Sequence, residues 1–321
     1  MIRWGILSTA RIAEKLIDGA RVAEDVEIVA VGSRDLARAR AFADEHGIPQ
    51  AFGSYEELLA SDIDAVYIPL PNALHVEWSV RALEAGKHVL CEKPLARDPA
   101  QVERAFDAAE RAGRVLMEAF MWRFHPQTAE VVRLVREGAL GSLRLIRAAF
   151  GFNLPWLENV RWERALEGGA LMDVGCYGVS AMRLLCDAEP ERVSGEQVVR
   201  NGVDARFAGV LRFPGDVLGV LDCGMDVHRR NSLEVVGDAG TILVPSPWQT
   251  PLGARIVLTR EGEPEEIRPE TVDPYARELE AMGRAIAAGE PPPLGRADAL
   301  GQASTIAALY RAAETGVAVR L

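Results

Sequence analysis

The sequence predicts an α/β protein: a doubly wound parallel sheet, followed by an α+β domain with a large, mainly antiparallel sheet. Up to residue 120, short β-rich runs alternate with helical patterns, which is typical of βαβ units. After Phe120, long alternating runs are joined by short turns, which indicates antiparallel pairing. We therefore expect two domains, residues 1–120 and residues 121–321. The last helix could pack back on the first domain.

The first domain should alternate strands and helices. Strands are expected at Ile2–Leu7, Glu27–Val31, Ala65–Ile68, His88–Cys91 and Val115–Met117. Helices are expected at Ile12–Gly19, Asp35–His46, Tyr55–Leu59, Leu74–Ala85 and Pro99–Ala112. Gly47, Gly86 and Gly113 each follow a helix, where a left-handed cap is favoured.

The second domain should be mostly strands, with a few helices. The strands are expected at Leu143–Phe152, Arg192–Arg200, Ala205–Phe213, Val217–Met225, Ser232–Val236, Thr241–Val244 and Arg255–Thr259. Helices are expected at Pro126–Glu137, Gly169–Cys186, Pro274–Ala288 and Ala297–Thr315.

Composition excludes several classes of protein. A formal net charge of −11 argues against nucleic acid as a partner, because neutralising phosphates needs a basic face. The four cysteines show no C-x-x-C spacing and indicate reduced core thiols, and the five scattered histidines indicate no catalytic metal. The chain opens directly on a strand, without a charged and apolar leader or a membrane-length apolar stretch. We expect a cytoplasmic protein that does not enter a membrane.

The turn after the first strand predicts a dinucleotide site. The usual G-x-G-x-x-G/A fingerprint lets backbone amides approach a pyrophosphate at a helix N-terminus. This chain has Ser8, Ala10 and Ala13 at those positions, and these small side chains leave room for phosphate provided the turn avoids positive φ. The expected contacts come from Ser8, Thr9, Ala10, Arg11 and Ile12.

The end of the second strand bears on the choice of cofactor. An NAD site normally places an acid there to hold the ribose 2′-hydroxyl. Here the strand ends in Ser33-Arg34, and the acid Asp35 comes one residue later. A hydroxyl and a guanidinium suit a 2′-phosphate, so NADP is favoured and NAD stays possible. The alternative is that Arg34 is only a solvated residue at the start of a helix.

A lysine at the end of the fourth strand is the first catalytic candidate. Among 36 basic side chains the lysines are only Lys15, Lys87 and Lys93. Lys93 offers a compact ammonium whose pKa burial can lower, which arginine cannot supply. A loop cap is the alternative.

Two motifs carry a resemblance to a known family. The run from Ile68 to His75 is followed by Glu92-Lys93-Pro94, and a later helix opens with G-G-x-x-x-D-x-G-x-Y over residues 168–177. With these motifs the chain resembles the Gfo/Idh/MocA oxidoreductases over essentially its whole length. Many members have His where this chain has Tyr177. Its tyrosine resembles the branch with dimeric dihydrodiol dehydrogenases, NADP-dependent D-xylose dehydrogenases and glucose–fructose oxidoreductase.

The resemblance implies that Lys93, Asp173 and Tyr177 meet the nicotinamide at the carboxyl edge of the parallel sheet. Independently, Asp173 and Tyr177 are four residues apart and share a helical face. A nearby ammonium would lower the pKa of a tyrosine that is otherwise a poor base. We expect Tyr177 to be the acid/base, Lys93 its electrostatic partner and Asp173 an orienting group. Direct proton acceptance by Lys93 is the alternative.

Further candidates surround this set. Pro71, Asn72, His75 and Glu92 are expected at the cofactor, although Pro71 and Asn72 could form a plain turn and His75 could simply start a helix. Several aromatic and basic residues could either line a sugar pocket or pack in the core: Trp122, Arg123, Phe124, His125, Phe152, Trp156 and Trp162. The substrate-binding candidates are Trp122, Arg123 and Phe152, together with Asp173 and Tyr177.

The expected function is NAD(P)-dependent hydride transfer to or from a sugar or diol, of the aldose 1-dehydrogenase type with D-xylose or D-glucose as substrate. A carbonyl or dihydrodiol-type reductase would use the same residues, and a non-catalytic NADP-binding sensor is a second alternative. An exposed sheet face needs a cover, and members of the family associate through that sheet. We expect a homodimer or a dimer of dimers.

Overall fold

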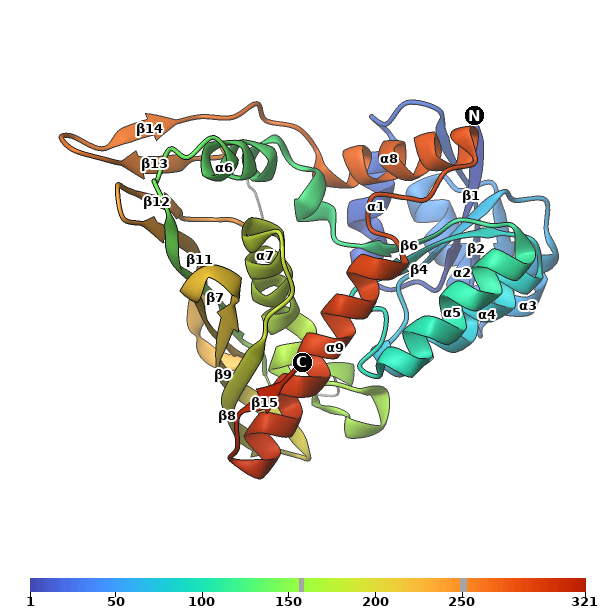
Figure 1. Ribbon diagram of the computed structural model, residues 1–321. Helices are drawn as coiled ribbons and strands as arrows, with labels where there is room; N and C mark the ends of the chain where they lie inside the picture. Colours follow the sequence, from blue (N-terminus) through green and yellow to red (C-terminus); the bar gives the residue numbers. More distant parts are fainter. Residues whose placement is uncertain (156–158, 249–252) are drawn as a thin grey trace. The chain divides into compact units, whose positions relative to one another are not determined.

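The computed structural model describes residues 1–155, 159–248 and 253–321, which form two compact units. The first unit comprises Met1–Phe124 and Val272–Leu300, and the second comprises His125–Thr271 and Gly301–Leu321 (Figure 1). The first unit therefore continues to Phe124 and includes a later stretch of chain that carries a helix, α8 (Pro274–Ala288).

A six-stranded parallel sheet in the order β3-β2-β1-β4-β5-β6 forms the centre of the first unit. This is the doubly wound order of dinucleotide-binding domains, and the prediction of a parallel sheet is confirmed. The strands are β1 (Ile2–Leu7), β2 (Val26–Gly32), β3 (Gln50–Phe52), β4 (Ala65–Ile68), β5 (His88–Glu92) and β6 (Leu116–Ala119). Sequence reasoning missed β3, because a three-residue edge strand has too few positions to show alternation.

Several helices of the first unit begin and end at capping residues. They are α1 (Ile12–Ala20), α2 (Leu36–His46), α3 (Tyr55–Ala60), α4 (His75–Glu84), α5 (Pro99–Ala112) and α8. Asp35, Ser54 and Asp98 cap α2, α3 and α5 through their side chains. Gly47 and Gly113 are left-handed at φ 72° and 60°, as the prediction of glycine caps requires. At Gly19 a Cβ would lie 2.8 Å from the Ala276 amide nitrogen, so glycine lets α1 and α8 approach closely.

The second unit contains a nine-stranded sheet in the order β14-β13-β12-β11-β7-β10-β9-β8-β15. All its pairs are antiparallel except β7 with β10, so the prediction of a mainly antiparallel sheet is confirmed. The strands are β7 (Leu143–Asn153), β8 (Arg192–Arg200), β9 (Val203–Phe213), β10 (Val217–Gly224), β11 (Asp226–Gly237), β12 (Thr241–Val244), β13 (Ile256–Thr259), β14 (Glu265–Ile267) and β15 (Val319–Arg320).

The two faces of this sheet differ in what covers them. On one face lies α7 (Cys176–Cys186), where Gly178 approaches Ala148 and Leu221, and Met182 covers Gly219. The opposite face presents apolar side chains to solvent, each 38–43% exposed: Val198, Val210, Leu218, Val220 and Leu243. Two further helices belong to this part of the chain, α6 (Pro126–Arg136) and, from residue 301 onward, α9 (Arg296–Thr315).

The four cysteines are free thiols, and three of them are buried. Burial raises the pKa of Cys186 to about 12 and holds the pKa of Cys91 and Cys223 above the usual range, so these thiols stay protonated. Across the ranges described above, no helix is both long and apolar enough to cross a membrane.

Candidate active site

The turn from β1 to α1 has a backbone conformation that glycine favours, although a serine occupies it. Ser8 has a φ of 137°, so the condition placed on a turn without glycine, that it avoid positive φ, is not met. The Ser8 hydroxyl accepts a hydrogen bond from the Ala10 amide at 3.2 Å and donates to the Pro69 carbonyl at 3.4 Å. These two bonds hold the strained turn and connect it to the loop after β4. The turn follows β1 and the loop follows β4, and the strand order of the sheet reverses between these two strands.

The N-terminus of α1 is accessible to an anion. Its N-cap residue, Arg11, makes no side-chain cap hydrogen bond, and Arg11 and Ile12 are exposed. Thr9 and Ala10 are half-buried, whereas Ala13 is fully buried against the sheet. The helix dipole and the first amides therefore point to a surface that a pyrophosphate could reach.

One acid and two arginines follow the end of β2. Asp35 is engaged as the N-cap of α2, since its Oδ1 accepts from the amides of Ala37 at 2.8 Å and Arg38 at 3.3 Å. Ser33 is 7% exposed, and Arg34 is exposed. Burial raises the pKa of Tyr55, and Arg34 and Arg38 both counteract this rise, so both cations lie near that hydroxyl. Arg38 is a residue that sequence reasoning missed.

His75 connects two loops beneath the surface. It is fully buried; Nδ1 lies 2.9 Å from the Pro94 carbonyl oxygen and Nε2 lies 2.8 Å from the Leu70 carbonyl oxygen. Burial lowers the pKa of His75 to about 4, so the ring is neutral and donates to one carbonyl at a time. Both ring nitrogens face the backbone, and the geometry supports a role in fixing the loops that carry Pro71, Asn72 and Lys93.

The backbone around Lys93 is held on both sides. Glu92 Oε1 accepts from the Tyr67 hydroxyl at 2.5 Å, and its Oε2 accepts from the Lys93 amide at 3.2 Å. The Lys93–Pro94 peptide bond is cis, and the next amide, that of Leu95, donates to the buried Glu118 at 2.8 Å. Lys93 itself is half-buried. Its side chain thus extends from a rigid loop at the carboxyl end of β5.

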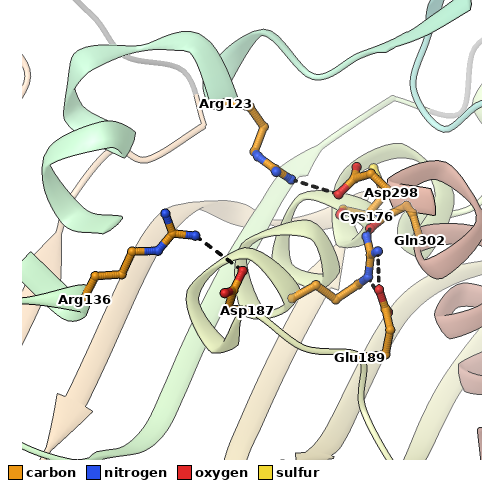
Figure 2. Close-up of polar contacts among 8 residues, drawn as sticks. Arg123, Arg136, Cys176, Asp187, Glu189, Asp298 and Gln302 are labelled. Atoms are coloured by element: carbon orange, nitrogen blue, oxygen red, sulfur yellow. Dashed lines mark hydrogen bonds and ion pairs between the residues drawn. The ribbon is translucent and has the colours of Figure 1, made fainter. Parts of the chain in front are cut away.

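Two of the substrate-pocket candidates, Trp122 and Arg123, belong to the first unit. Trp122 is 2% exposed, and Arg123 is paired with Asp298 at 3.5 Å (Figure 2). Because the Arg123 side chain is 13% exposed, most of its surface is covered by protein. This environment resembles a packed ion pair more than an open sugar subsite.

Asp173 and Tyr177 lie in the second unit on a helix that begins irregularly. Residues Leu171–Gly175 form a π turn, which passes directly into α7. π turns are rare and occur frequently at functional sites. The expectation of one regular helix from Gly169 to Cys186 is therefore wrong in its first turn, and hydrophobic periodicity does not reveal such an insertion.

Each of the two side chains has a defined neighbour. Asp173 accepts a hydrogen bond from Arg161 Nε at 2.7 Å. Tyr177 is 7% exposed and packs edge-on against Phe150, with ring centroids 5.4 Å apart, and against Trp248 at 5.8 Å. The aromatic contacts fix the ring plane of Tyr177 and leave its hydroxyl end to polar chemistry.

The remaining aromatic candidates differ in position. Phe152 is half-buried near the end of β7, and Trp162 is 6% exposed. Trp156 lies outside the described residues. Phe150 and Trp248 are contacts of Tyr177 that sequence reasoning missed.

Three polar residues around the π turn were also missed: Arg161, Asp204 and Gln302. Asp204 accepts from the Leu171 amide at 2.7 Å. Gln302 donates to the Cys176 carbonyl at 2.7 Å, and Figure 2 shows both of these residues. A sequence signal existed for Asp204, because an acid interrupts an apolar run at the start of a strand. Gln302 sits in an alanine-rich helix and gives no such signal.

A parallel sheet of this strand order, with an open helix N-terminus at its reversal point, defines a dinucleotide-binding domain of the kind that nicotinamide-dependent oxidoreductases use. Residues 2–120 match the model of an oxidoreductase family with an NAD-binding Rossmann fold. Residues 128–243 match the GFO/IDH/MocA C-terminal domain. The chain belongs to the GFO/IDH/MocA oxidoreductase family, and the resemblance found in the sequence is confirmed.

Three similar proteins illustrate the range of the family. D-xylose 1-dehydrogenase (NADP(+)) 2 of Haloferax volcanii is 42% identical over 325 residues, covering 99% of both chains. Trans-1,2-dihydrobenzene-1,2-diol dehydrogenase of Danio rerio is 37% identical, over 78% of this chain and 76% of that protein. The crystal structure of a 3-ketoreductase from Actinomadura kijaniata in complex with NADP and TDP-benzene is 32% identical, with a TM-score of 0.92 over 97% of each chain.

Proposed function

We propose that this oxidoreductase prefers NADP and oxidises the C1 hydroxyl of an aldose, with D-xylose or D-glucose as substrate. The observation that carries the proposal is its similarity, over nearly the full length of both chains, to an NADP-dependent D-xylose 1-dehydrogenase. Retention of Lys93, Asp173 and Tyr177 supports an enzyme over a non-catalytic sensor.

The residues of the first unit fit a dinucleotide. The open turn at Thr9, Ala10 and Arg11 would receive the pyrophosphate. Ser33 and Arg34, with Arg38 beside them, would hold a 2′-phosphate, because Asp35 is already engaged as a helix cap. Pro71, Asn72 and Glu92 would line the nicotinamide end. The proposal includes these assignments. It also includes a cofactor domain of residues 1–120 and a substrate domain of residues 121–321.

When bound, the nicotinamide accepts or supplies the hydride. The chain's own task is to move the proton of the reacting hydroxyl. In the proposed arrangement the Tyr177 hydroxyl takes that proton, and the Lys93 ammonium favours the phenolate form. Asp173, held in place by Arg161, accepts a hydrogen bond from a sugar hydroxyl and thereby orients the substrate. The alternative proton acceptor is Lys93 itself.

A reductase that acts on a carbonyl carbon is the second candidate. Its support is the similarity to a 3-ketoreductase and to a dihydrodiol dehydrogenase. The same groups would work in reverse, with Tyr177 delivering the proton to the new hydroxyl.

We further propose a homodimer, or a dimer of dimers, formed through the uncovered face of the nine-stranded sheet. Val210 and Val220 face each other on β9 and β10, and both are exposed. Contiguous exposed apolar side chains of this kind mark association surfaces. A cytoplasmic location belongs to the same proposal.

A screen at 340 nm tests the function. The purified chain is assayed with NADP and with NAD against D-xylose, D-glucose, myo-inositol and a trans-diol, and with NADPH against ketosugars. We expect the highest kcat/KM for an aldose with NADP. Turnover of NADPH with a ketosugar alone would favour the reductase. Tight NADP binding without any turnover would contradict both and favour a sensor.

A further inference from the structure

Gln302 lies at the centre of a buried hydrogen-bond network in the second unit. It is 1% exposed; its Nε2 donates to the Cys176 carbonyl at 2.7 Å, and its Oε1 accepts from Arg183 Nη1 at 3.3 Å (Figure 2). Arg183 is itself buried and makes two further bonds to Glu189, at 2.7 and 2.6 Å. Because a guanidinium only donates and a carbonyl only accepts, these partners determine the orientation of the amide.

The carbonyl that Gln302 binds lies at the junction of two helical geometries. Cys176 is the first residue of α7 and follows the π turn Leu171–Gly175. It also directly precedes Tyr177. A shift of this peptide would therefore move the Tyr177 side chain relative to Asp173, which lies on the other side of the junction.

A second anchor holds the start of the π turn. Asp204 is 2% exposed; its Oδ2 accepts from the Leu171 amide at 2.7 Å, and its Oδ1 accepts from the Tyr310 hydroxyl at 2.8 Å. At Gly169, which has a φ of 124°, a Cβ would lie 2.0 Å from the Asp204 carboxylate. Tyr310 and Gln302 are eight residues apart, so both project from one face of α9.

We propose that Gln302 is a positioning residue of the active site: it fixes the Cys176 peptide and so holds Tyr177 in register with Asp173. Asp204 and Tyr310 hold the other end of the same turn. This inference rests on the proposed function, because it assumes that Tyr177 and Asp173 act on the substrate. Loss of the donor would leave the Cys176 carbonyl with only the intrahelical bond of α7 and would release this peptide from α9.

Gln302→Glu is the discriminating substitution. The glutamate keeps an acceptor for Arg183, and the Arg183 guanidinium keeps the new carboxylate ionised. The substitution removes the donor to the Cys176 carbonyl. The matched control is Thr305→Val, which changes a fully buried side chain of α9 whose hydroxyl has no hydrogen-bond partner among the described residues. Both variants are compared with the full-length wild-type chain.

Two measurements are made on each variant. We expect Gln302→Glu to lower kcat about 10- to 100-fold while the KM for NADP stays within about twofold, as misplacement of a catalytic group predicts. Hydrogen exchange of a peptide covering residues 169–180 should be faster in Gln302→Glu than in wild type. Thr305→Val should resemble wild type in both measurements.

Several outcomes would overturn the inference. Wild-type kcat in a folded Gln302→Glu variant would do so, and so would equal losses in Gln302→Glu and Thr305→Val. A wild-type chain that turns over no substrate would remove the proposed function. In that case the exchange measurement still decides whether Gln302 holds the turn, since unchanged exchange would contradict it.

Discussion

Asp173 and Arg161 form an ion pair in which the guanidinium Nε lies 2.7 Å from the carboxylate Oδ2. The Asp173 side chain is 12% exposed and that of Arg161 is 43% exposed. A partly buried carboxylate paired with a guanidinium accepts hydrogen bonds in a fixed orientation. Asp173 is therefore suited to orienting a hydroxyl.

Replacing Arg161 with alanine should weaken substrate orientation. Asp173 would lose the partner that fixes its rotamer, and we expect kcat/KM for the sugar to fall about 10- to 100-fold. The KM for NADP should change little. The control is Arg164→Ala, which removes an exposed arginine three residues later. Equal effects of the two substitutions, measured by steady-state kinetics, would contradict a specific role for Arg161.

Ser8 offers a test of backbone strain in the cofactor turn. Ser8→Ala keeps the positive φ and loses both hydroxyl bonds, whereas Ser8→Gly loses the same bonds but relieves the strain. Strain of this kind destabilises the folded chain by on the order of 1–3 kcal/mol. Glycine relieves this strain, but it also raises the entropy of the unfolded chain, which offsets part of the stabilisation. We expect Ser8→Gly to be more stable than Ser8→Ala by about 1 kcal/mol.

Urea denaturation of the two Ser8 variants, followed by circular dichroism, measures that difference. The wild-type chain serves as the reference for the lost hydrogen bonds. Equal stability of the two variants would mean that the strain at the φ of Ser8 is no larger than the entropic cost of glycine in the unfolded chain.

The sequence was sufficient to predict the architecture, because hydrophobic periodicity and helix-capping residues are local signals. Strand β4 is an unbroken buried run from Ala65 to Ile68, and α5 begins at the Asp98 cap and ends before Gly113. The short strands β3 and β14 carry too few residues for any period to appear.

The polar contacts around the candidate site could not be predicted in the same way. Gln302 meets Cys176 across 126 residues of sequence, and Asp204 meets Leu171 across 33. Such pairings depend on how elements pack, which a single sequence does not encode as a local pattern. The positive φ of Ser8 was missed because serine has no preference for that conformation.

Arg34 should determine the preference between the two nicotinamide cofactors. An ion pair with a phosphate contributes about 1.5–3 kcal/mol, so Arg34→Ala should raise the KM for NADP about 10- to 100-fold. The KM for NAD should stay within about twofold. The control is Arg40→Ala, which changes an exposed arginine on α2. It should leave the KM values for NADP and NAD near those of the wild type. A parallel rise for NADP and NAD after Arg34→Ala would argue against 2′-phosphate recognition.

The uncovered sheet face should control the oligomeric state. Val220→Arg places a charge among exposed apolar side chains, and we expect it to dissociate the dimer, since desolvating an unpaired charge at an interface is costly. Analytical ultracentrifugation of the variant and the wild type measures the change in mass. Val22→Arg, at a residue 67% exposed in the first unit, should keep the wild-type mass. A wild-type chain that sediments as a monomer would exclude the proposed dimer.

His75 should make the folded chain less stable as the pH falls below neutrality. Burial lowers its pKa from 6.5 to about 4, so between these values the unfolded chain binds a proton that the folded chain does not. Stability should therefore be unaffected above about pH 6.5, fall by at most about 1.4 kcal/mol per pH unit on the way to pH 4, and level off below it. His88, whose pKa is also lowered to about 4, contributes with the same sign.

The difference between wild type and His75→Gln isolates this contribution, because other titrating groups are common to both chains. Glutamine retains a donor for the carbonyls of Leu70 and Pro94 but does not titrate. The two curves of unfolding free energy against pH should converge as the pH falls from 6.5 to 4, because only the wild type loses stability to His75 there. If His75→Gln does not fold, His88→Gln gives the same comparison, since His88 Nδ1 accepts from the Val115 amide and is neutral in that contact. Parallel curves would mean that the pKa of His75 in the folded chain is not lowered below its value in the unfolded chain.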